Sequence, residues 1–187
     1  DNLYHGSGVV KQLKRANTQT KNNTIFAYRV NDPERYGIVE FNEKGKPFNI
    51  EEKPKNPKSR YAITGLYFFD DSVVEKAKKV KPSKRGELEI TSILNMYLKE
   101  KNLDLELLGR GIAWLDTGTF DALHQAGSYI RTIEKRQGLK IGCPEEISWR
   151  KGWISDEEFL QIGYKLGNDD YLEYIKRIKE DKTQGII

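Results

Sequence analysis

A single carboxylate stands at the most chemically suggestive point of the sequence. Residues 114–119 read Trp-Leu-Asp-Thr-Gly-Thr, so Asp116 follows apolar residues and precedes a glycine flanked by two hydroxyls. Residues 103–109 alternate apolar and polar side chains as a strand does, whereas residues 120–137 have helical spacing. Asp116 therefore falls in a connection between two elements, where ligand-binding residues are common. The alternative is structural, because Asp116 or Thr119 would suit the N-cap of the following helix.

A second charged group stands at residues 51–54, which read Glu-Glu-Lys-Pro. Pro54 ends the preceding strand because it lacks the backbone donor that a ladder needs. If Glu52 faces a cleft, its carboxylate can accept hydrogen bonds from sugar hydroxyls, and Lys53 can reach an anionic group. The alternative is a solvated charge pair.

Two further positions could contact a ligand. Arg85 precedes Gly86 in a predicted loop just before a helix, where a guanidinium can bind phosphate through two hydrogen bonds. An ordinary surface arginine is the alternative. Gly37, next to Tyr36, either lets a ligand approach the backbone or marks a bulge in its strand.

The first two residues, Asp1 and Asn2, place an acid and an amide before a glycine-bearing turn. Both side chains could face a ligand, and a frayed chain end is the alternative. Because the chain opens without methionine, we expect it to be part of a longer protein.

The elements that must position these residues follow from periodicity and turn residues. Residues 61–70 form the most apolar strand and are expected at the centre of a sheet. Other predicted strands are 24–30 and a hairpin of 36–41 with 47–51, and predicted helices are 9–16, 71–79, one running toward residue 100, and 120–136. From residue 145 onward, apolar residues recur at helical spacing among charges. They predict two or three helices that pack on their own domain or on another subunit.

Length and composition limit the class of protein. The chain has 187 residues and 21.6 kDa, enough for one sizeable domain or one domain with a helical appendage. Its 32 Lys and Arg against 28 Asp and Glu are dispersed, which does not indicate a nucleic-acid partner. The single cysteine, Cys143, excludes an intramolecular disulfide, fits a reducing cytoplasm and is predicted to be a buried apolar filler. No apolar run is long enough to cross a membrane.

Taken in order, these motifs closely resemble the sugar-1-phosphate nucleotidylyltransferases. The matching segments are Asp1-Asn2, Tyr36-Gly37, residues 51–54, residues 64–67, residues 85–89 and residues 114–119. The similarity extends over essentially the whole chain, and residues 134–138 and 143–152 are typical of the thymidylyl subgroup. An ordered set of this kind is far more specific than any single motif.

The resemblance implies a role for each matching residue. It places a catalytic Mg²⁺ between Asp1 and Asp116, and it makes Lys53 and Arg85 ligands of the sugar phosphate. The residues that match hexose contacts are Asn2, Gly37 and Glu52, with Ile63 at the sugar-site wall and Tyr36, Tyr67 and Trp114 lining the same pocket. A second, regulatory nucleotide site at a subunit interface is matched by Gly6, Arg110, Ile147 and Arg150.

The resemblance also implies a fold and a reaction. The expected fold is α/β, the C-terminal part of a Rossmann-like nucleotidyltransferase mixed sheet flanked by helices. Residues 1–138 would form the sugar-phosphate and metal half, and residues 139–187 a helical region for subunit and regulatory contacts. The expected reaction converts dTTP and α-D-glucose 1-phosphate into dTDP-glucose, a precursor of dTDP-rhamnose and other deoxysugars, and pyrophosphate. The expected assembly is a cytoplasmic homotetramer.

Several family features would precede Asp1: the opening strand, its Gly-rich loop for the triphosphate and the glutamine that reads the base. We therefore expect residues 1–187 alone to be inactive. The main alternative is a non-catalytic relative that binds sugar phosphate or regulates. A metal-dependent glycosyltransferase fits less well, because it gives no reason for the motifs at residues 51–54 and 85–89.

Overall fold

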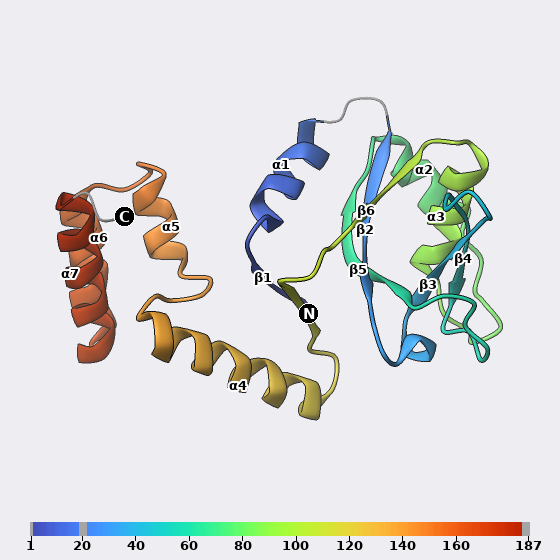
Figure 1. Ribbon diagram of the computed structural model, residues 1–187. Helices are drawn as coiled ribbons and strands as arrows, with labels where there is room; N and C mark the ends of the chain where they lie inside the picture. Colours follow the sequence, from blue (N-terminus) through green and yellow to red (C-terminus); the bar gives the residue numbers. More distant parts are fainter. Residues whose placement is uncertain (1, 19–21, 185–187) are drawn as a thin grey trace. The chain divides into compact units, whose positions relative to one another are not determined.

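The computed structural model describes residues 2–18 and 22–184, with strands and helices up to residue 116 and helices after it (Figure 1). In chain order the elements are β1 (Asn2–Gly6), α1 (Val9–Thr18), β2 (Asn23–Arg29), the 3-10 turn η1 (Pro33–Arg35), β3 (Gly37–Phe41), β4 (Pro47–Glu52), β5 (Tyr61–Phe68), α2 (Ser72–Lys78), α3 (Ile90–Lys99), β6 (Leu103–Leu107), β7 (Ile112–Asp116), α4 (Phe120–Gln137), α5 (Pro144–Arg150), α6 (Asp156–Leu166) and α7 (Asp169–Thr183). Two compact units, 1–123 and 124–187, divide the chain within α4.

A five-stranded sheet organises the first unit. Its strand order is β4-β3-β5-β2-β6, and β2 runs parallel to β6 while the other neighbouring pairs are antiparallel. The expected position of β5 at the centre is confirmed, as is the hairpin of β3 and β4. The predicted mixed sheet flanked by helices is therefore present.

A separate two-stranded sheet pairs β1 with β7, with Asn2 opposite Asp116. The sequence did not predict β1, because its residues lack a clear apolar alternation and end at a glycine. None of its five residues is fully buried, so this strand has no buried face. Its backbone pairing with β7 is what makes it a strand. The pairing brings the start of the described chain next to Asp116.

Alternation along β2 directs side chains into two cores. Ile25 and Ala27 pack with Leu94 of α3, whereas Phe26 points the other way and packs with Val9 and Ala16 of α1. Figure 1 shows the same layering, with α3 on one face of the sheet and α1 on the other. The sheet is therefore covered on both faces, which holds its strand ends in fixed positions.

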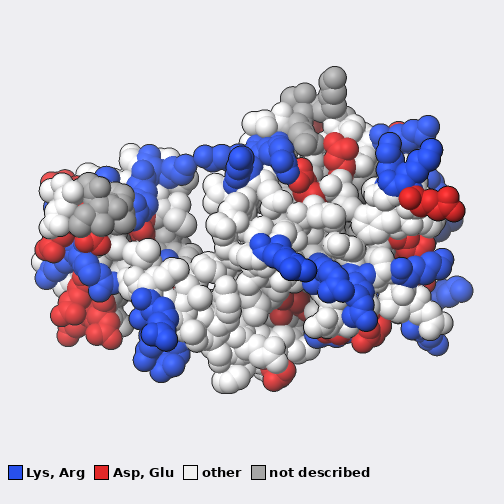
Figure 2. All heavy atoms as spheres, in the orientation of Figure 1, with Lys and Arg blue, Asp and Glu red and all other residues white. Residues whose placement is uncertain are grey.

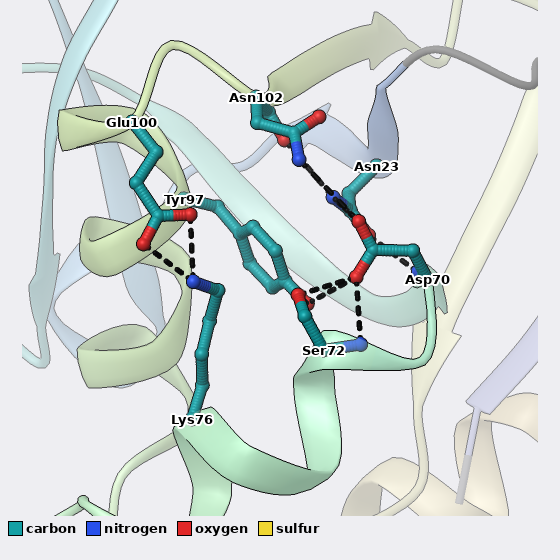
Figure 3. A network of polar contacts seen from close by, with 7 residues as sticks. All are labelled: Asn23, Asp70, Ser72, Lys76, Tyr97, Glu100 and Asn102. Carbon is teal, nitrogen blue, oxygen red and sulfur yellow. Dashed lines mark hydrogen bonds and ion pairs between the residues drawn. The ribbon is translucent and has the colours of Figure 1, made fainter.

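A polar network closes the end of β5 (Figure 3). The Asp70 carboxylate accepts hydrogen bonds from the backbone N–H of Ser72 at 3.0 Å and from the Ser72 hydroxyl at 2.5 Å. Asn23 and Tyr97 donate to the same carboxylate at 3.2 and 3.1 Å, and the Asn23 side chain accepts from the Asp70 backbone N–H. These donors, led by the Ser72 hydroxyl, lower the Asp70 pKa to about 2.

The second unit contains the predicted C-terminal helices, which number three after α4. Their core is built mainly from α5, α6 and α7, and its fully buried members include Phe159, Ile175 and Ile178. Ser155 starts α6 with a capping box, since its side chain and that of Glu158 each accept a backbone N–H of the other.

Cys143 is buried in this core, as predicted, but it also makes polar contacts. Its Sγ lies 2.9 Å from the Tyr171 hydroxyl and 3.5 Å from the Glu145 carboxylate. Burial raises the pKa of the Cys143 thiol. The side chain thus ties the start of α5 to α7 instead of acting as an apolar filler alone.

The surface carries both signs of charge. On the face shown in Figure 2, Lys and Arg lie in several separate places among Asp and Glu, in keeping with the dispersed charges of the sequence. Within residues 2–18 and 22–184, no helix combines the length and apolar character needed to cross a membrane.

Candidate functional site

A cavity of about 590 Å³ opens in the first unit, within the usual size of a small-molecule site. Residues from β1, β3, β4, β5 and β7 line it together with the start of α3. Nine residues predicted to serve the site are in its lining: Asn2, Tyr36, Gly37, Glu52, Lys53, Ile63, Tyr67, Trp114 and Asp116. Residues spread over more than one hundred positions of sequence are thus gathered in one place.

An aromatic cluster supports one wall of the cavity. The buried Trp114 ring lies 5.2 Å from the Tyr36 ring and 5.9 Å from the Tyr28 ring, measured between centroids. Its indole N–H donates to the Asn2 side-chain oxygen at 2.9 Å. That bond leaves the Asn2 amide N–H₂ to act as a donor toward a ligand.

Gly65 makes room for the Asn2 side chain. Its φ is +75°, and a Cβ built there would lie 2.7 Å from the Asn2 Nδ2. Both the left-handed backbone and the close approach require glycine at this position. The neighbouring Thr64 carbonyl accepts a hydrogen bond from the Tyr4 hydroxyl, which fixes this part of β5 beside β1.

Glu52 faces the cavity at the end of β4, directly opposite Gly37 of β3. A Cβ on Gly37 would come within 3.2 Å of the Glu52 Oε2 and 3.0 Å of the Thr91 methyl, so the glycine provides space for the carboxylate. Burial and the nearby Glu89 carboxylate raise the pKa of Glu52, although Thr91 donates a hydrogen bond to it. Burial and the Glu52 charge also raise the pKa of Tyr67 to about 12.

Lys53 has a strained backbone. Its φ is +43°, a left-handed conformation that non-glycine residues seldom adopt, and it also precedes Pro54. The Lys53 backbone N–H donates to the Tyr36 carbonyl at 3.0 Å, which holds the bend in place. Strain of this kind commonly persists where a side chain must be aimed at a ligand.

Asp116 ends β7 at the edge of the cavity, with its side chain about 28% exposed. Its Oδ1 accepts the Gly118 backbone N–H at 3.2 Å, and its Oδ2 lies 3.8 Å from the Arg35 guanidinium. Thr119 caps α4 instead, because its hydroxyl accepts the Ala122 backbone N–H at 3.2 Å. The capping alternative therefore applies to Thr119 and leaves the Asp116 carboxylate facing the cavity.

The structure describes one of the two predicted metal ligands, Asp116. Asp1 lies outside the described residues, although its neighbour Asn2 pairs with Asp116 across β1 and β7. Among residues 2–18 and 22–184, no three side chains of His, Cys, Asp or Glu gather closely enough to hold a metal ion. The described part of the site thus offers the Asp116 carboxylate and the space next to it.

Arg85 does not contribute to the lining formed by the described residues. Its guanidinium lies 2.8 Å from Glu87, 3.6 Å from Glu89 and 3.7 Å from Glu52. The contact with Glu52 nevertheless places it beside a residue that does line the cavity.

The four residues assigned to a regulatory site fall into the two units. Gly6 and Arg110 belong to the first, where a Cβ on Gly6 would lie 2.2 Å from the Gly111 carbonyl oxygen. Ile147 and Arg150 belong to the second, on α5. Ile147 is about half exposed, and the Arg150 Nε donates to the Glu146 carboxylate at 2.7 Å.

The sequence analysis assigned no role to Arg35. The structure puts Arg35 in the cavity lining, with its guanidinium 5.4 Å from the centre of the Tyr36 ring and 2.8 Å from the Asp32 carboxylate. Its position next to Tyr36, a predicted pocket residue, was the available signal. Thr91 was missed for a similar reason, since it directly follows the motif at residues 85–89 in a segment predicted only as a helix.

Known proteins resemble the chain in both sequence and structure. A family model described as "Nucleotidyl transferase" matches residues 1–132. The glucose-1-phosphate thymidylyltransferase of Neisseria meningitidis is 49% identical over 178 residues, which are 95% of this chain and 62% of that protein. The protein of the same name from Mycobacterium tuberculosis is 47% identical over 180 residues, 96% of this chain and 62% of the relative. The chain thus spans about 62% of the length of these curated relatives.

Solved structures agree with the sequence comparison. A structure described as a glucose-1-phosphate thymidylyltransferase from Bacillus anthracis in complex with a sucrose matches with a TM-score of 0.59 and 39% identity, covering 70% of this chain and 52% of that one. A UDP-glucose pyrophosphorylase complexed with UDP-glucose matches with a TM-score of 0.60 at 19% identity, covering 70% and 53%, and supports the fold alone. The predicted nucleotidyltransferase fold is confirmed, and the chain belongs to the nucleotidyl transferase family.

Proposed function

We propose that the whole protein containing this chain transfers a thymidylyl group from dTTP to α-D-glucose 1-phosphate, giving dTDP-glucose and pyrophosphate. The observation that carries this proposal is the gathering of nine predicted site residues around one cavity, seven of them on five strands and two, Tyr36 and Lys53, directly next to strand ends. The names of the curated relatives support the choice of nucleotide and sugar.

The sugar would bind through side chains that already face the cavity. Glu52 has acceptor capacity for hexose hydroxyls, and the Asn2 amide N–H₂ has donors for ring or hydroxyl oxygens. Trp114 and Tyr36 provide an apolar wall for the face of the pyranose ring. Polar groups and aromatic carbon in one cavity suit a sugar, which has both kinds of surface.

The phosphate would bind where the positive charges converge. Lys53 lines the cavity and Arg85 lies beside it, so the two can neutralise a phosphate that projects from the sugar. The sugar-phosphate oxygen would attack the α-phosphorus of dTTP in line. No general base is needed because a phosphate monoester is already ionised at neutral pH, and catalysis then consists mainly of positioning and charge neutralisation.

A Mg²⁺ ion fits the donors at the edge of this cavity. Mg²⁺ commonly takes one or two carboxylates and completes its shell with water and substrate phosphates, so the Asp116 carboxylate, with Asp1 as its proposed partner, is a suitable ligand set. When bound, the ion would supply a Lewis acid that offsets phosphoryl charge. The hydrogen bond from the Gly118 N–H restricts rotation of the Asp116 carboxylate.

The wider assignments complete the proposal. We propose that residues 1–138 form the sugar-phosphate and metal half, and that residues 139–187 supply subunit and regulatory contacts. Gly6, Arg110, Ile147 and Arg150 would then serve a regulatory nucleotide site between subunits of a cytoplasmic homotetramer.

Product analysis tests the proposed function directly. The whole protein is incubated with Mg²⁺, dTTP and glucose 1-phosphate, and the products are separated by chromatography and identified by mass. We expect equal amounts of dTDP-glucose and pyrophosphate, with none when EDTA is added. Binding of glucose 1-phosphate without any product would instead support a non-catalytic sugar-phosphate-binding protein.

A further inference from the structure

Arg85 is surrounded by three carboxylates, an arrangement that the proposed phosphate role does not explain. Its Nη2 lies 2.8 Å from the Glu87 carboxylate, and its Nη1 lies 3.6 Å from Glu89 and 3.7 Å from Glu52. Three carboxylates therefore surround one guanidinium, and Lys53, whose charge also acts on Glu52, adds a second positive charge. With three negative charges against two positive ones, a phosphate approaching Arg85 in this state would meet a net negative field.

The three carboxylates differ in how firmly they are held. The Glu89 side chain is 10% exposed and accepts a hydrogen bond from the Ser83 hydroxyl at 2.9 Å, while the Glu52 side chain is 20% exposed and faces the cavity. The Glu87 side chain is 58% exposed and makes the shortest contact with Arg85. Glu87 is thus the partner that Arg85 can exchange for another anion at the lowest cost, because water can solvate the carboxylate that is released.

The backbone around Arg85 is fixed even though its side chain can turn. The Ser83 backbone N–H donates to the Glu87 carbonyl at 2.8 Å, and the Gly86 N–H donates to the Ser83 carbonyl at 2.9 Å. The Arg85 N–H donates to the Ser83 hydroxyl at 3.1 Å. A change of side-chain rotamer would therefore suffice to move the guanidinium between Glu87 and the cavity.

We propose that Glu87 competes with the sugar phosphate for Arg85 and thereby sets the affinity of the site. This inference rests on the proposed function. Glu52 couples binding of the sugar to binding of the phosphate. A hexose hydroxyl that donates a hydrogen bond to Glu52 weakens the contact between Glu52 and Arg85, and the guanidinium is then free to bind the phosphate. The site should accordingly favour a sugar phosphate over inorganic phosphate or free sugar.

Calorimetric titration of the whole protein tests the competition. Glu87→Gln removes the competing charge. Glu75→Gln is the matched control, because Glu75 is also exposed and forms an ion pair with a nearby basic residue, Lys78, at 2.6 Å. An exposed ion pair of this kind changes a binding constant by about two- to fivefold. We expect glucose 1-phosphate to bind about two- to fivefold more tightly to E87Q than to the parent. Affinity for glucose should stay the same in E87Q, and E75Q should match the parent.

A double-mutant cycle shows whether the effect passes through Arg85. In an Arg85→Ala background, Glu87→Gln should no longer change the affinity for glucose 1-phosphate. An equal gain with and without Arg85 would overturn the proposal, since it would mean a general charge effect. Unchanged or weaker binding by E87Q would also overturn it.

The same titrations separate this inference from the proposed reaction. Tighter binding by E87Q in a protein that forms no dTDP-glucose would refute the reaction and support the competition. If the parent protein forms dTDP-glucose but E87Q binds glucose 1-phosphate no more tightly, the reaction is supported and the competition is refuted. A parent that binds no glucose 1-phosphate at all would overturn both.

Discussion

Two carboxylates at strand ends of the same sheet have opposite electrostatic surroundings. Asp70, just beyond β5, accepts hydrogen bonds from Ser72, Asn23 and Tyr97, and these lower its pKa to about 2. Glu52, the last residue of β4, is half-buried, and burial together with the Glu89 charge raises its pKa although Lys53, Arg85 and a hydrogen bond from Thr91 act in the opposite direction. The fold thus stabilises the charge of Asp70 and, on balance, disfavours that of Glu52.

The difference separates a structural carboxylate from a binding carboxylate. The donors around Asp70 come from β2, α2 and α3, with Asn102 before β6 at 3.4 Å, and leave it little capacity for further bonds (Figure 3). Glu52 lines a cavity, where donors of a ligand can reach its carboxylate. Donors supplied by a ligand would stabilise the Glu52 charge, whereas they could add nothing at Asp70.

The largest expected effect is on turnover, at Asp116. In the whole protein, Asp116→Asn should lower the rate of dTDP-glucose formation by on the order of 10²-fold or more. The substitution removes the negative charge of a proposed Mg²⁺ ligand, and this charge serves the reaction and not the stability of the fold. The midpoint of thermal unfolding should stay nearly unchanged. Near-normal turnover at saturating Mg²⁺ would contradict the assignment of Asp116 as a metal ligand.

The converse variant is Asp70→Asn, which should affect stability and spare binding. An asparagine would present an N–H₂ group to the Asn23 Nδ2 donor, so that hydrogen bond would be lost. Because the Asp70 side chain is exposed, we expect the free energy of unfolding to fall by only about 0.5–1.5 kcal/mol, measured by urea denaturation, while glucose 1-phosphate affinity is unchanged. Asp71→Asn is the control, since the Asp71 side chain makes no capping bond, and it should stay within about 0.5 kcal/mol of the parent. Loss of glucose 1-phosphate affinity in Asp70→Asn would contradict the distinction between Asp70 as a structural carboxylate and Glu52 as a ligand-binding one.

Lys53 allows binding and backbone strain to be separated at one residue. Lys53→Ala and Lys53→Gly should both raise the KM for glucose 1-phosphate more than the KM for dTTP, because each removes the same positive charge. Lys53→Gly should be more stable than Lys53→Ala by about 1 kcal/mol, since only glycine adopts the φ of +43° without a steric cost. Equal stability of the two variants would show that the bend relaxes, and equal effects on both substrates would count against the role of Lys53.

The sequence predicted those features whose causes are local. The hairpin of β3 and β4, the central β5 and the long α4 all carry strong periodicity or turn residues, and all are present. The residues of the cavity were found through an ordered set of motifs and not through periodicity. The roles of individual residues in that cavity remain predictions.

Features that depend on tertiary contacts could not be predicted. Strand β1 exists through its pairing with β7, and its own side chains give no such pattern. The left-handed bend at Lys53 contradicts local preference both for a lysine and for a residue before proline. Of the three carboxylates around Arg85, Glu87 and Glu89 are close in sequence, whereas the contact with Glu52 depends on long-range folding.

The smallest expected effect is the pH dependence of stability, where the two carboxylates should act with opposite signs. The Asp70 pKa is lowered from 3.8 to about 2, so its contribution is complete above about pH 4 and is lost as the pH falls toward 2. The Glu52 pKa is raised from 4.5, so its contribution is complete below that value and is lost as the pH rises through its folded-state pKa. Solvent screening keeps the Asp70 effect small, because this side chain is exposed. Urea denaturation between pH 2 and 7 should therefore show that Asp70→Asn loses less stability than the parent on acidification, while Glu52→Gln gains relative to the parent as the pH rises. Shifts of the same sign in the two variants would refute the contrast between a carboxylate stabilised by the fold and one left for a ligand.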